Sequence, residues 1–265
     1  MLSSDALAGT SLSDAGFQIV NIGAGFDTLF WQLRDAGIHP KRFVEFDFPG
    51  VTSKKIHAIS KDGSPLYGAV SKDANRPATD IQHVDLHGDT YHLVGVDVRN
   101  PKEIRAKLAD CGISGSLPTL ILSECVLVYM TSDQSNNLLA TLANVFTTAL
   151  FVNYEQVNIN DQFGAIMQDY LHSRGVALTG VSACESLESQ ISRFLECGWL
   201  KAKAWTMSQV YAKLSQAEVK RISALEFLDE IELLTQLLDH YCISVGIKCS
   251  SEMGTLRLNE VVGFD

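Results

Sequence analysis

The feature that most restricts the fold is a strand-like run that ends in closely spaced glycines and is followed by a helical pattern. Residues 18–22 (QIVNI) are rich in β-branched side chains, and the tripeptide G-A-G at residues 23–25 follows them directly. Residues 27–34 then repeat apolar side chains at helical spacing, and residues 42–46 (RFVEF) form a second strand-like run. A strand, a tight turn, a helix and a second strand in this order predict a βαβ unit with parallel strands.

The same alternation continues along the chain. Further strand-like runs lie at residues 91–96, 119–122, 149–152, 200–205 and 241–248, and helical patterns lie at 101–108, 133–146, 161–174, 187–197 and 224–238. Capping boxes are expected at Thr131 with Gln134 and at Ser215 with Glu218. Residues 61–87 carry many turn-forming side chains and are interpreted as a loop region. The expected fold is α/β, a doubly wound, mostly parallel seven-stranded sheet, with its ligand site beyond the carboxyl ends of the strands.

Composition supports one large globular domain. The chain has 265 residues, of which 46% are hydrophobic and 20% are charged, so it can bury a core without disulfide bonds. No pair of its six cysteines has C-x-x-C spacing, and we expect them to be reduced. Residues 1–265 are therefore treated as a single domain, with a helical insertion at about 155–240 that contributes to substrate binding.

Charge and hydropathy argue against nucleic-acid binding and against a membrane segment. The formal net charge is −10 and the sequence has no run of basic residues, which argues against a protein that binds nucleic acid. The N-terminus lacks a basic stretch followed by an apolar one, and no run of 18 apolar residues occurs, so no membrane segment is expected. We expect a cytoplasmic monomer.

Polar residues mark the predicted ligand edge. Gly23 and Gly25 would let backbone N–H groups approach a nucleotide-like ligand, although Thr28 stands where a dinucleotide fingerprint needs its third glycine. An acidic group at the end of the second strand can accept hydrogen bonds from ribose hydroxyls. Asp47 is favoured for this role, and Glu45 is the competing candidate.

Two further carboxylates follow later strands. Asp97 stands where it can accept a hydrogen bond from an exocyclic amine such as adenine N6. Glu124 interrupts an apolar segment, and because burying an unpaired carboxylate is costly, it reads either as a contact to a cationic ligand or as the partner of a structural arginine. The polar residues 153–156 (NYEQ) end the next strand and are expected at the rim of the site.

Other chemistries find little support. His83, His87 and His92 are loosely spaced, and no H-E-x-x-H motif or i, i+4 histidine pair is present, so no metal site is predicted. A serine-nucleophile elbow is also missing.

Four segments in the same order resemble the leucine carboxyl methyltransferase family. They are N-I-G-A-G at 21–25, E-F-D-F-P at 45–49, E-C-V-L-V-Y-M at 124–130 and N-Y-E-Q-V-N at 153–158. The resemblance implies an S-adenosylmethionine-dependent methyltransferase of Rossmann-like fold. Its expected reaction is methylation of the C-terminal leucine carboxylate of the catalytic subunit of type 2A protein phosphatase.

The same resemblance implies roles for individual residues. The cofactor contacts would be Gly23, Asp47, Asp97, the backbone of Val98, and Glu124. Tyr129 would face the substrate carboxylate, with no general base.

The N-terminus departs from the family pattern. Family members have a helical extension with basic residues before the first strand, whereas here 17 residues precede Gln18 and none is Lys or Arg. We therefore expect a shortened N-terminus and a weakened anion-binding side of the site. The alternatives are a catalytically impaired product that still binds the phosphatase and a related tRNA-modifying carboxyl methyltransferase; a nicotinamide-dependent dehydrogenase is more distant.

Overall fold

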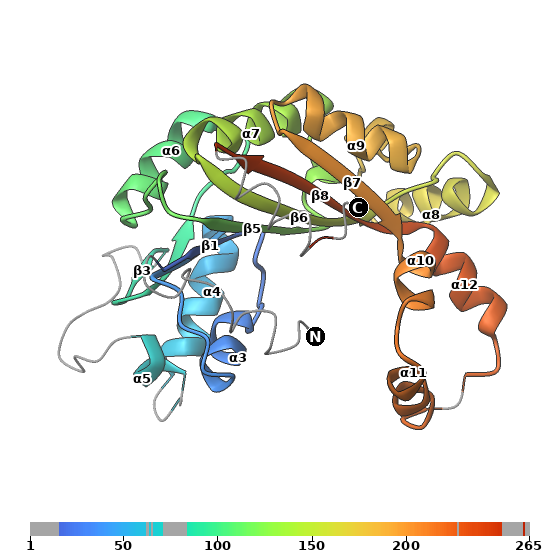
Figure 1. Ribbon diagram of the computed structural model, residues 1–265, viewed down its shortest axis with the longest axis horizontal. Coiled ribbons are helices and arrows are strands. Elements are labelled where there is room, and N and C mark those ends of the chain that lie inside the picture. The colour runs from blue at the N-terminus through green and yellow to red at the C-terminus, as the bar shows by residue number, and fades with distance from the viewer. Residues whose placement is uncertain are drawn as a thin grey trace.

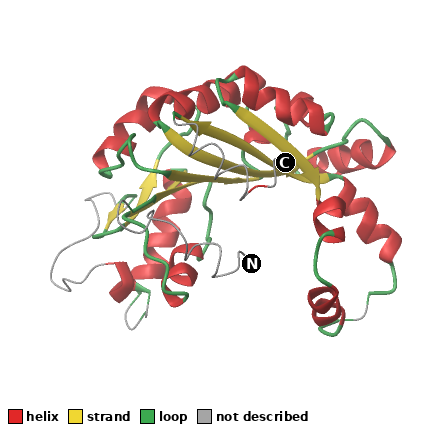
Figure 2. Ribbon diagram, in the orientation of Figure 1, coloured by secondary structure: helices red, strands yellow, loops and turns green. Residues whose placement is uncertain are grey.

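The protein forms one twisted sheet covered on both faces by helices (Figures 1 and 2). The structure is a computed structural model that describes residues 16–61, 64, 66–70, 84–226, 228–250 and 262. Within these residues the sheet has eight strands, in the order β3-β4-β2-β1-β5-β6-β8-β7. The predicted α/β class is thus confirmed.

Five neighbouring strands are parallel, and the antiparallel pairs lie toward the two edges. β1 pairs in parallel with β2 and β5, β2 with β4, and β5 with β6, whereas β8 is antiparallel to both β6 and β7. The strands are β1 (Gln18–Ile22), β2 (Arg42–Asp47), β3 (Leu86–His87), β4 (Tyr91–Gly95), β5 (Thr119–Glu124), β6 (Thr148–Gln156), β7 (Lys201–Thr206) and β8 (Tyr241–Cys249). The seven expected strands are all present, and the eighth is the two-residue β3, antiparallel to β4. A pair of residues is too short to show a strand period in a sequence.

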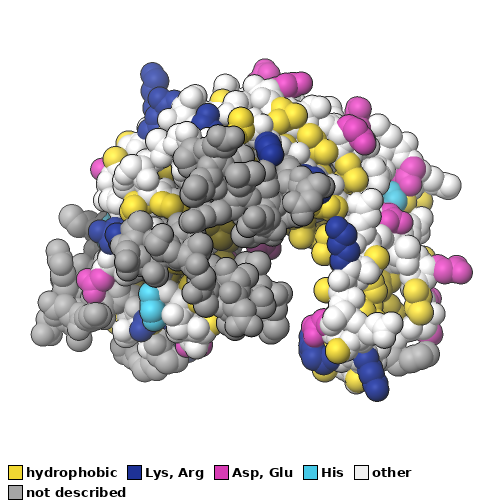
Figure 3. All heavy atoms as spheres, viewed as in Figure 1, with side chains coloured by type: hydrophobic (Ala, Val, Ile, Leu, Met, Phe, Trp, Pro, Cys, Tyr) yellow, Lys and Arg dark blue, Asp and Glu magenta, His cyan; other side chains and the backbone are white. Residues whose placement is uncertain are grey.

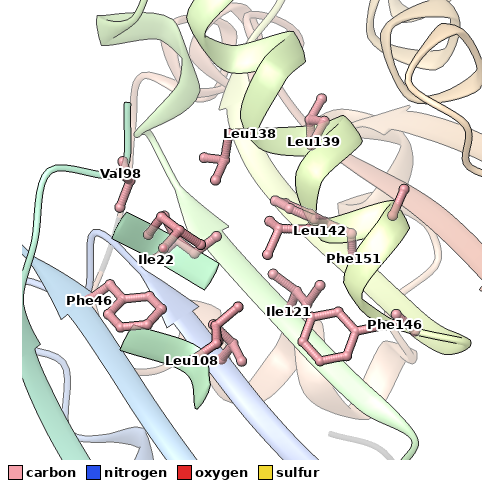
Figure 4. Close-up of a cluster of buried hydrophobic side chains, with 14 of the residues drawn as sticks. Ile22, Phe46, Val98, Leu108, Ile121, Leu138, Leu139, Leu142, Phe146 and Phe151 are labelled. Atoms are coloured by element: carbon pink, nitrogen blue, oxygen red, sulfur yellow. The ribbon is translucent and has the colours of Figure 1, made fainter. Parts of the chain in front are cut away.

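Alternating side chains of the central strands divide the core into two layers. Val20 and Ile22 of β1 pack in the larger cluster, on the face covered by α6 and α7, whereas Ile19 packs in the cluster with Phe30 and Trp31 of α3. The larger cluster, drawn in Figure 4, includes Ile121 of β5. β1, β2 and β4 are buried on both faces, as is typical of parallel strands covered by helices, whereas alternate residues of β5 and β6 are only half-buried.

Several helices begin at a residue whose side chain caps the first turn. The Thr131 and Gln134 capping box is confirmed, while Ser215 accepts only the backbone N–H of Glu218, whose carboxylate pairs with Arg221. The longer helices are α3 (Leu29–Asp35), α4 (Pro49–Ser60), α6 (Pro101–Asp110), α7 (Ser132–Val145), α8 (Gln162–Ser173), α9 (Leu187–Glu196), α11 (Gln216–Ser223) and α12 (Ile231–Asp239). The shorter ones are α5 (Tyr67–Val70), α10 (Met207–Ala212) and the 3₁₀ turns η1 (Leu127–Tyr129) and η2 (Val181–Cys184).

Three segments differ from the sequence expectation. The expected helix over 224–238 begins only at Ile231, as α12. The preceding helix, α11, ends at Ser223. The expected loop over 61–87 contains α5 and β3, and residues 62–63, 65 and 71–83 of it lie outside the described residues. α4 was not expected at all, although Pro49 at its first turn is a residue that favours a helix start.

Among the described residues, no helix combines the length and the apolar character needed to cross a bilayer.

Candidate functional site

Four predicted contacts lie at one edge of the sheet, because they follow the carboxyl ends of neighbouring parallel strands. Gly23 follows β1, Asp47 ends β2, Asp97 comes shortly after β4, and Glu124 ends β5. The register aligns Ile22 with both Phe46 and Ser123, so these strands end at the same level. This edge is where open α/β sheets bind their ligands.

The glycine turn closes tightly over β2. The backbone N–H groups of Gly23 and Ala24 both donate to the carbonyl of Phe46, at 2.7 and 3.1 Å. Gly23 and Gly25 have φ angles of +68° and +52°, a region that L side chains rarely adopt. A Cβ at Gly23 would lie 2.3 Å from Cγ2 of Val126, whereas a Cβ at Gly25 would meet no heavy atom within 4 Å. Gly25 therefore faces open space at the expected ligand position.

Asp47 is fixed to that turn by backbone donors. Its Oδ2 accepts the N–H of Gly25 at 2.8 Å, and its Oδ1 accepts the N–H of Phe48 at 2.7 Å. The side chain is half-buried, and each carboxylate oxygen can accept a second hydrogen bond. Asp47 can thus accept hydroxyl groups beside the glycine turn.

Glu45, the competing candidate, points into the protein and is fully buried. Its Oε2 accepts Lys55 Nζ at 2.5 Å and the Tyr91 hydroxyl at 2.7 Å. Burial raises the pKa of Glu45 to about 7, and Lys55 opposes that shift. Lys55 also donates to the Asp27 carbonyl at 2.6 Å, so this cluster is connected to the segment that follows the glycine turn.

The Asp97 carboxylate already has a partner. Arg99 donates to it through its backbone N–H, Nε and Nη2, at 2.6 to 3.1 Å. These bonds lower the pKa of Asp97. Because they use both carboxylate oxygens, an adenine amine would have to share or displace Arg99. Val98, beside it, is buried in the core, with its side chain in the larger cluster.

Glu124 corrects one premise of the sequence interpretation, because its side chain is exposed rather than buried. It ends β5, and the next residue, Cys125, has a left-handed φ of +52° and donates its N–H to the Tyr154 carbonyl at 2.7 Å. The carboxylate therefore stands at the mouth of the site, where it can accept an ammonium group without a burial penalty.

The buried carboxylate of this region is Glu155, which the sequence placed at an open rim. Its Oε2 accepts Arg193 Nη1 at 2.9 Å, and its Oε1 accepts the Val128 N–H at 2.8 Å. Both side chains of this ion pair are at most 3% exposed. Burial raises the pKa of Glu155, and Arg193 opposes that shift. Asn153 and Gln156 are buried as well, so only Tyr154 of the four rim residues is accessible.

Tyr129 ends η1 and is half-exposed beside the site. Its carbonyl accepts the Thr179 hydroxyl at 2.7 Å. The rings of Tyr154 and Tyr241 stack nearby, with centroids 5.3 Å apart. Burial is the main cause that raises the pKa of Tyr129, and Cys125 and Tyr241 contribute to it. Tyr241 and Arg193 were not expected at the site, because distant segments supply them.

Three features of this edge fit S-adenosylmethionine. The open space at Gly25 admits a ligand against the backbone, Asp47 offers fixed acceptors, and Glu124 offers an accessible carboxylate. No metal ligand is needed at this edge for such a compound to bind.

Comparisons with known proteins point to one family. The family profile described as "Leucine carboxyl methyltransferase" matches residues 4–143. The bovine protein named leucine carboxyl methyltransferase 1 is 46% identical over 245 residues, which cover 91% of this chain and 73% of the bovine one. A rat tRNA wybutosine-synthesizing protein 4 is 32% identical over 242 residues, covering 89% of this chain and 34% of that protein.

A solved structure supports the fold alone. An O-methyltransferase family protein from Burkholderia thailandensis superposes with a TM-score of 0.51 at 10% identity, covering 94% of this chain and 55% of that one.

Proposed function

The chain belongs to the leucine carboxyl methyltransferase family and is an S-adenosylmethionine-dependent methyltransferase, and from this premise we propose its substrate. The substrate is the C-terminal leucine carboxylate of the catalytic subunit of type 2A protein phosphatase, on which the enzyme forms a methyl ester. The resemblance of the sequence motifs supports this assignment, and the name of the bovine relative supports only its leucine carboxyl part.

The observation that carries the proposal is that Gly23, Asp47 and Glu124 come at the aligned carboxyl ends of β1, β2 and β5, with η1 and Tyr129 shortly after β5. S-adenosylmethionine supplies an electrophilic methyl group on a sulfonium, so a carboxylate oxygen forms the new C–O bond while the S–C electron pair returns to sulfur. An α-carboxyl group has a pKa of about 3.3–3.7 and is already ionised at neutral pH. The protein therefore needs to hold and align the two reactants, and no side chain has to remove a proton.

Each residue has a separate part in that alignment. Asp47 accepts ribose hydroxyls while two backbone N–H groups hold its carboxylate in place. Glu124 accepts the ammonium group of the methionyl part. Tyr129 presents its hydroxyl to the leucine carboxylate, and because burial raises its pKa, the hydroxyl keeps the proton that it donates.

The helical segment at about 155–240 supplies the protein-binding surface in this proposal. α10, α11 and α12 project from the end of the sheet as an arm (Figure 1), and apolar side chains gather on that arm (Figure 3). Leu225, between α11 and α12, and Ile231 and Leu233 of α12 are 74%, 64% and 56% exposed. A single leucine offers little to recognise, so contacts with the folded phosphatase would add selectivity.

Incubation of the purified chain with radiolabelled S-adenosylmethionine and phosphatase core enzyme tests the proposal. We expect base-labile label in the catalytic subunit, and none when its C-terminal leucine is deleted. Label in tRNA instead of the phosphatase would replace this substrate with that of the tRNA-modifying alternative, to which the net charge of −10 is poorly suited. No transfer to the phosphatase by a chain that binds the cofactor would refute it.

A further inference from the structure

Three side chains with metal-ligating atoms converge at the opposite end of β4 from Asp97. His87 of β3 and His92 of β4 are cross-strand partners, and their Nδ1 atoms lie 3.1 Å apart. Cys111 follows the last residue of α6, and its Sγ and one ring nitrogen of each histidine all lie within 4.8 Å of one another. The three ligands therefore come from two elements, the β3–β4 hairpin and α6.

Burial leaves part of this cluster without a partner. His92 is 8% exposed, and its Nε2 is buried with no hydrogen-bond partner. Cys111 is 1% exposed and its thiol is free. His87 is exposed, so the cluster opens to solvent on one side. Since Nδ1 of His92 lies at hydrogen-bond distance from Nδ1 of His87, Nε2 is the His92 nitrogen left for another partner, and an orphaned buried atom of this kind calls for an explanation such as a bound ion.

We propose that His87, His92 and Cys111 bind one Zn²⁺ ion, which ties the β3–β4 hairpin to the end of α6. Two imidazoles and a thiolate are ligands that zinc prefers, and the exposed side leaves its fourth position to water. With metal–ligand lengths of about 2.0–2.3 Å, tetrahedral ligands lie roughly 3.3–3.6 Å apart, so closing the cluster needs a movement of about 1 Å.

The electrostatics of the cluster are compatible with this role. Burial is the main cause that lowers the pKa of His92 to about 4, and the nearby His87 and Arg42 add to that shift. Burial raises the pKa of the Cys111 thiol to about 12, which opposes the thiolate, so zinc binding has to displace that proton to solvent. Asp85 and Asp110 add negative charge near the thiol, while Lys107 and Arg42 oppose it.

The site is structural, because it lies away from the proposed reactants. His92 is the second residue of β4, whereas Asp97 follows the carboxyl end of the same strand. Its occupation should stabilise the sheet edge without contributing a catalytic group, so the inference stands or falls separately from the proposed function.

Titration of the reduced, tag-free chain with Co²⁺ tests the ligand set directly. We expect one equivalent to bind with visible d–d bands and a near-ultraviolet thiolate-to-cobalt charge-transfer band. Cys111→Ser should lose the charge-transfer band, and His87→Gln should weaken Zn²⁺ affinity at least about tenfold in competition with a chromophoric chelator. Zn²⁺ should raise the melting temperature of the wild type and not that of His87→Gln.

Matched variants separate this site from other thiols and histidines. Cys249→Ser, at a half-buried cysteine of β8, and His57→Gln, at an exposed histidine of α4, should bind like the wild type. His87 is exposed, so its variant tests the site even where Cys111→Ser does not fold. A wild-type cobalt complex without the charge-transfer band, or equal Zn²⁺ affinity in His87→Gln, would overturn the proposal.

Discussion

At the scale of single residues, the two glycines of the turn after β1 make separable contributions. Gly23→Ala should lower the free energy of unfolding more than Gly25→Ala does. Both variants place a side chain at positive φ, which costs about 1–2 kcal/mol, but only the first adds a clash with Val126, 2.3 Å from the new Cβ. Gly25→Ala should instead weaken S-adenosylmethionine binding, because its methyl group enters the open space. Urea unfolding and calorimetry measure the two effects.

A double variant is the control for this pair. Val126→Ala combined with Gly23→Ala removes the clashing Cγ2 and should recover part of the lost stability. Equal unfolding midpoints for the two single glycine variants would show that Val126 is not what restricts Gly23.

The acidic residues of the site give a second residue-scale prediction. Asp47→Ala and Glu124→Ala should each weaken S-adenosylmethionine binding by roughly 10- to 150-fold, because each removes a charge-assisted acceptor worth about 1.5–3 kcal/mol. Isothermal titration measures the affinity, and Asp110→Ala, at an exposed residue that ends α6, is the matched control. Unchanged affinity in both site variants would remove them from the cofactor site.

Which carboxylates reach the site could be predicted only in part. Asp47 could be predicted at the ligand edge because it is the last residue of its strand. Strand alternation also predicts that Glu45 and Phe46 point to opposite faces of the sheet. The burial of Glu155 and the exposure of Glu124 could not be read in the same way. Burial at the end of a strand depends on what packs over it, and Arg193 comes from α9, far away in the sequence.

At the scale of elements, the buried pair Glu155 and Arg193 holds η1, and with it Tyr129, in place. Arg193→Met should lower the free energy of unfolding by about 3–5 kcal/mol, because it leaves a buried carboxylate without its partner. Glu155→Gln combined with Arg193→Met should be less destabilised than Arg193→Met alone. In the double variant kcat should fall while cofactor affinity stays constant, since the loss concerns the position of Tyr129. Urea unfolding and methyl-transfer kinetics check these outcomes, and a double variant with unchanged kcat would leave the pair a purely structural role.

Helices and strands could be predicted from the sequence where one hydrophobic pattern dominates the segment. The parallel strands β1, β2 and β4 are buried on both faces and show as largely apolar runs, and Thr131 and Gln134 mark the start of α7. α4 was missed because its apolar pattern is weak and it follows β2 after one residue. The cluster of His87, His92 and Cys111 was missed for another reason. Its two histidines meet across a hairpin rather than along a helix, so helical spacing does not reveal them.

At the scale of the whole molecule, the sheet and the arm of α10 to α12 should serve different reactants. The carboxyl edge of the sheet carries the proposed cofactor contacts, whereas the arm carries exposed apolar side chains. The net charge of −10 makes nucleic acid a poor partner, and exposed apolar area on a projecting arm favours a protein.

Charged substitutions on the arm separate the two roles. Ile231→Asp and Leu233→Asp, at side chains 64% and 56% exposed, should raise KM for the phosphatase severalfold and leave S-adenosylmethionine affinity unchanged. Stability should change by no more than about 0.5 kcal/mol, because the sites are exposed. Leu195→Asp, at a leucine of α9 that is 47% exposed, is the matched control and should leave KM unchanged. Equal KM values in all three variants and the wild type would move the protein-binding surface away from the arm, while the cofactor contacts at the sheet edge would stay as proposed.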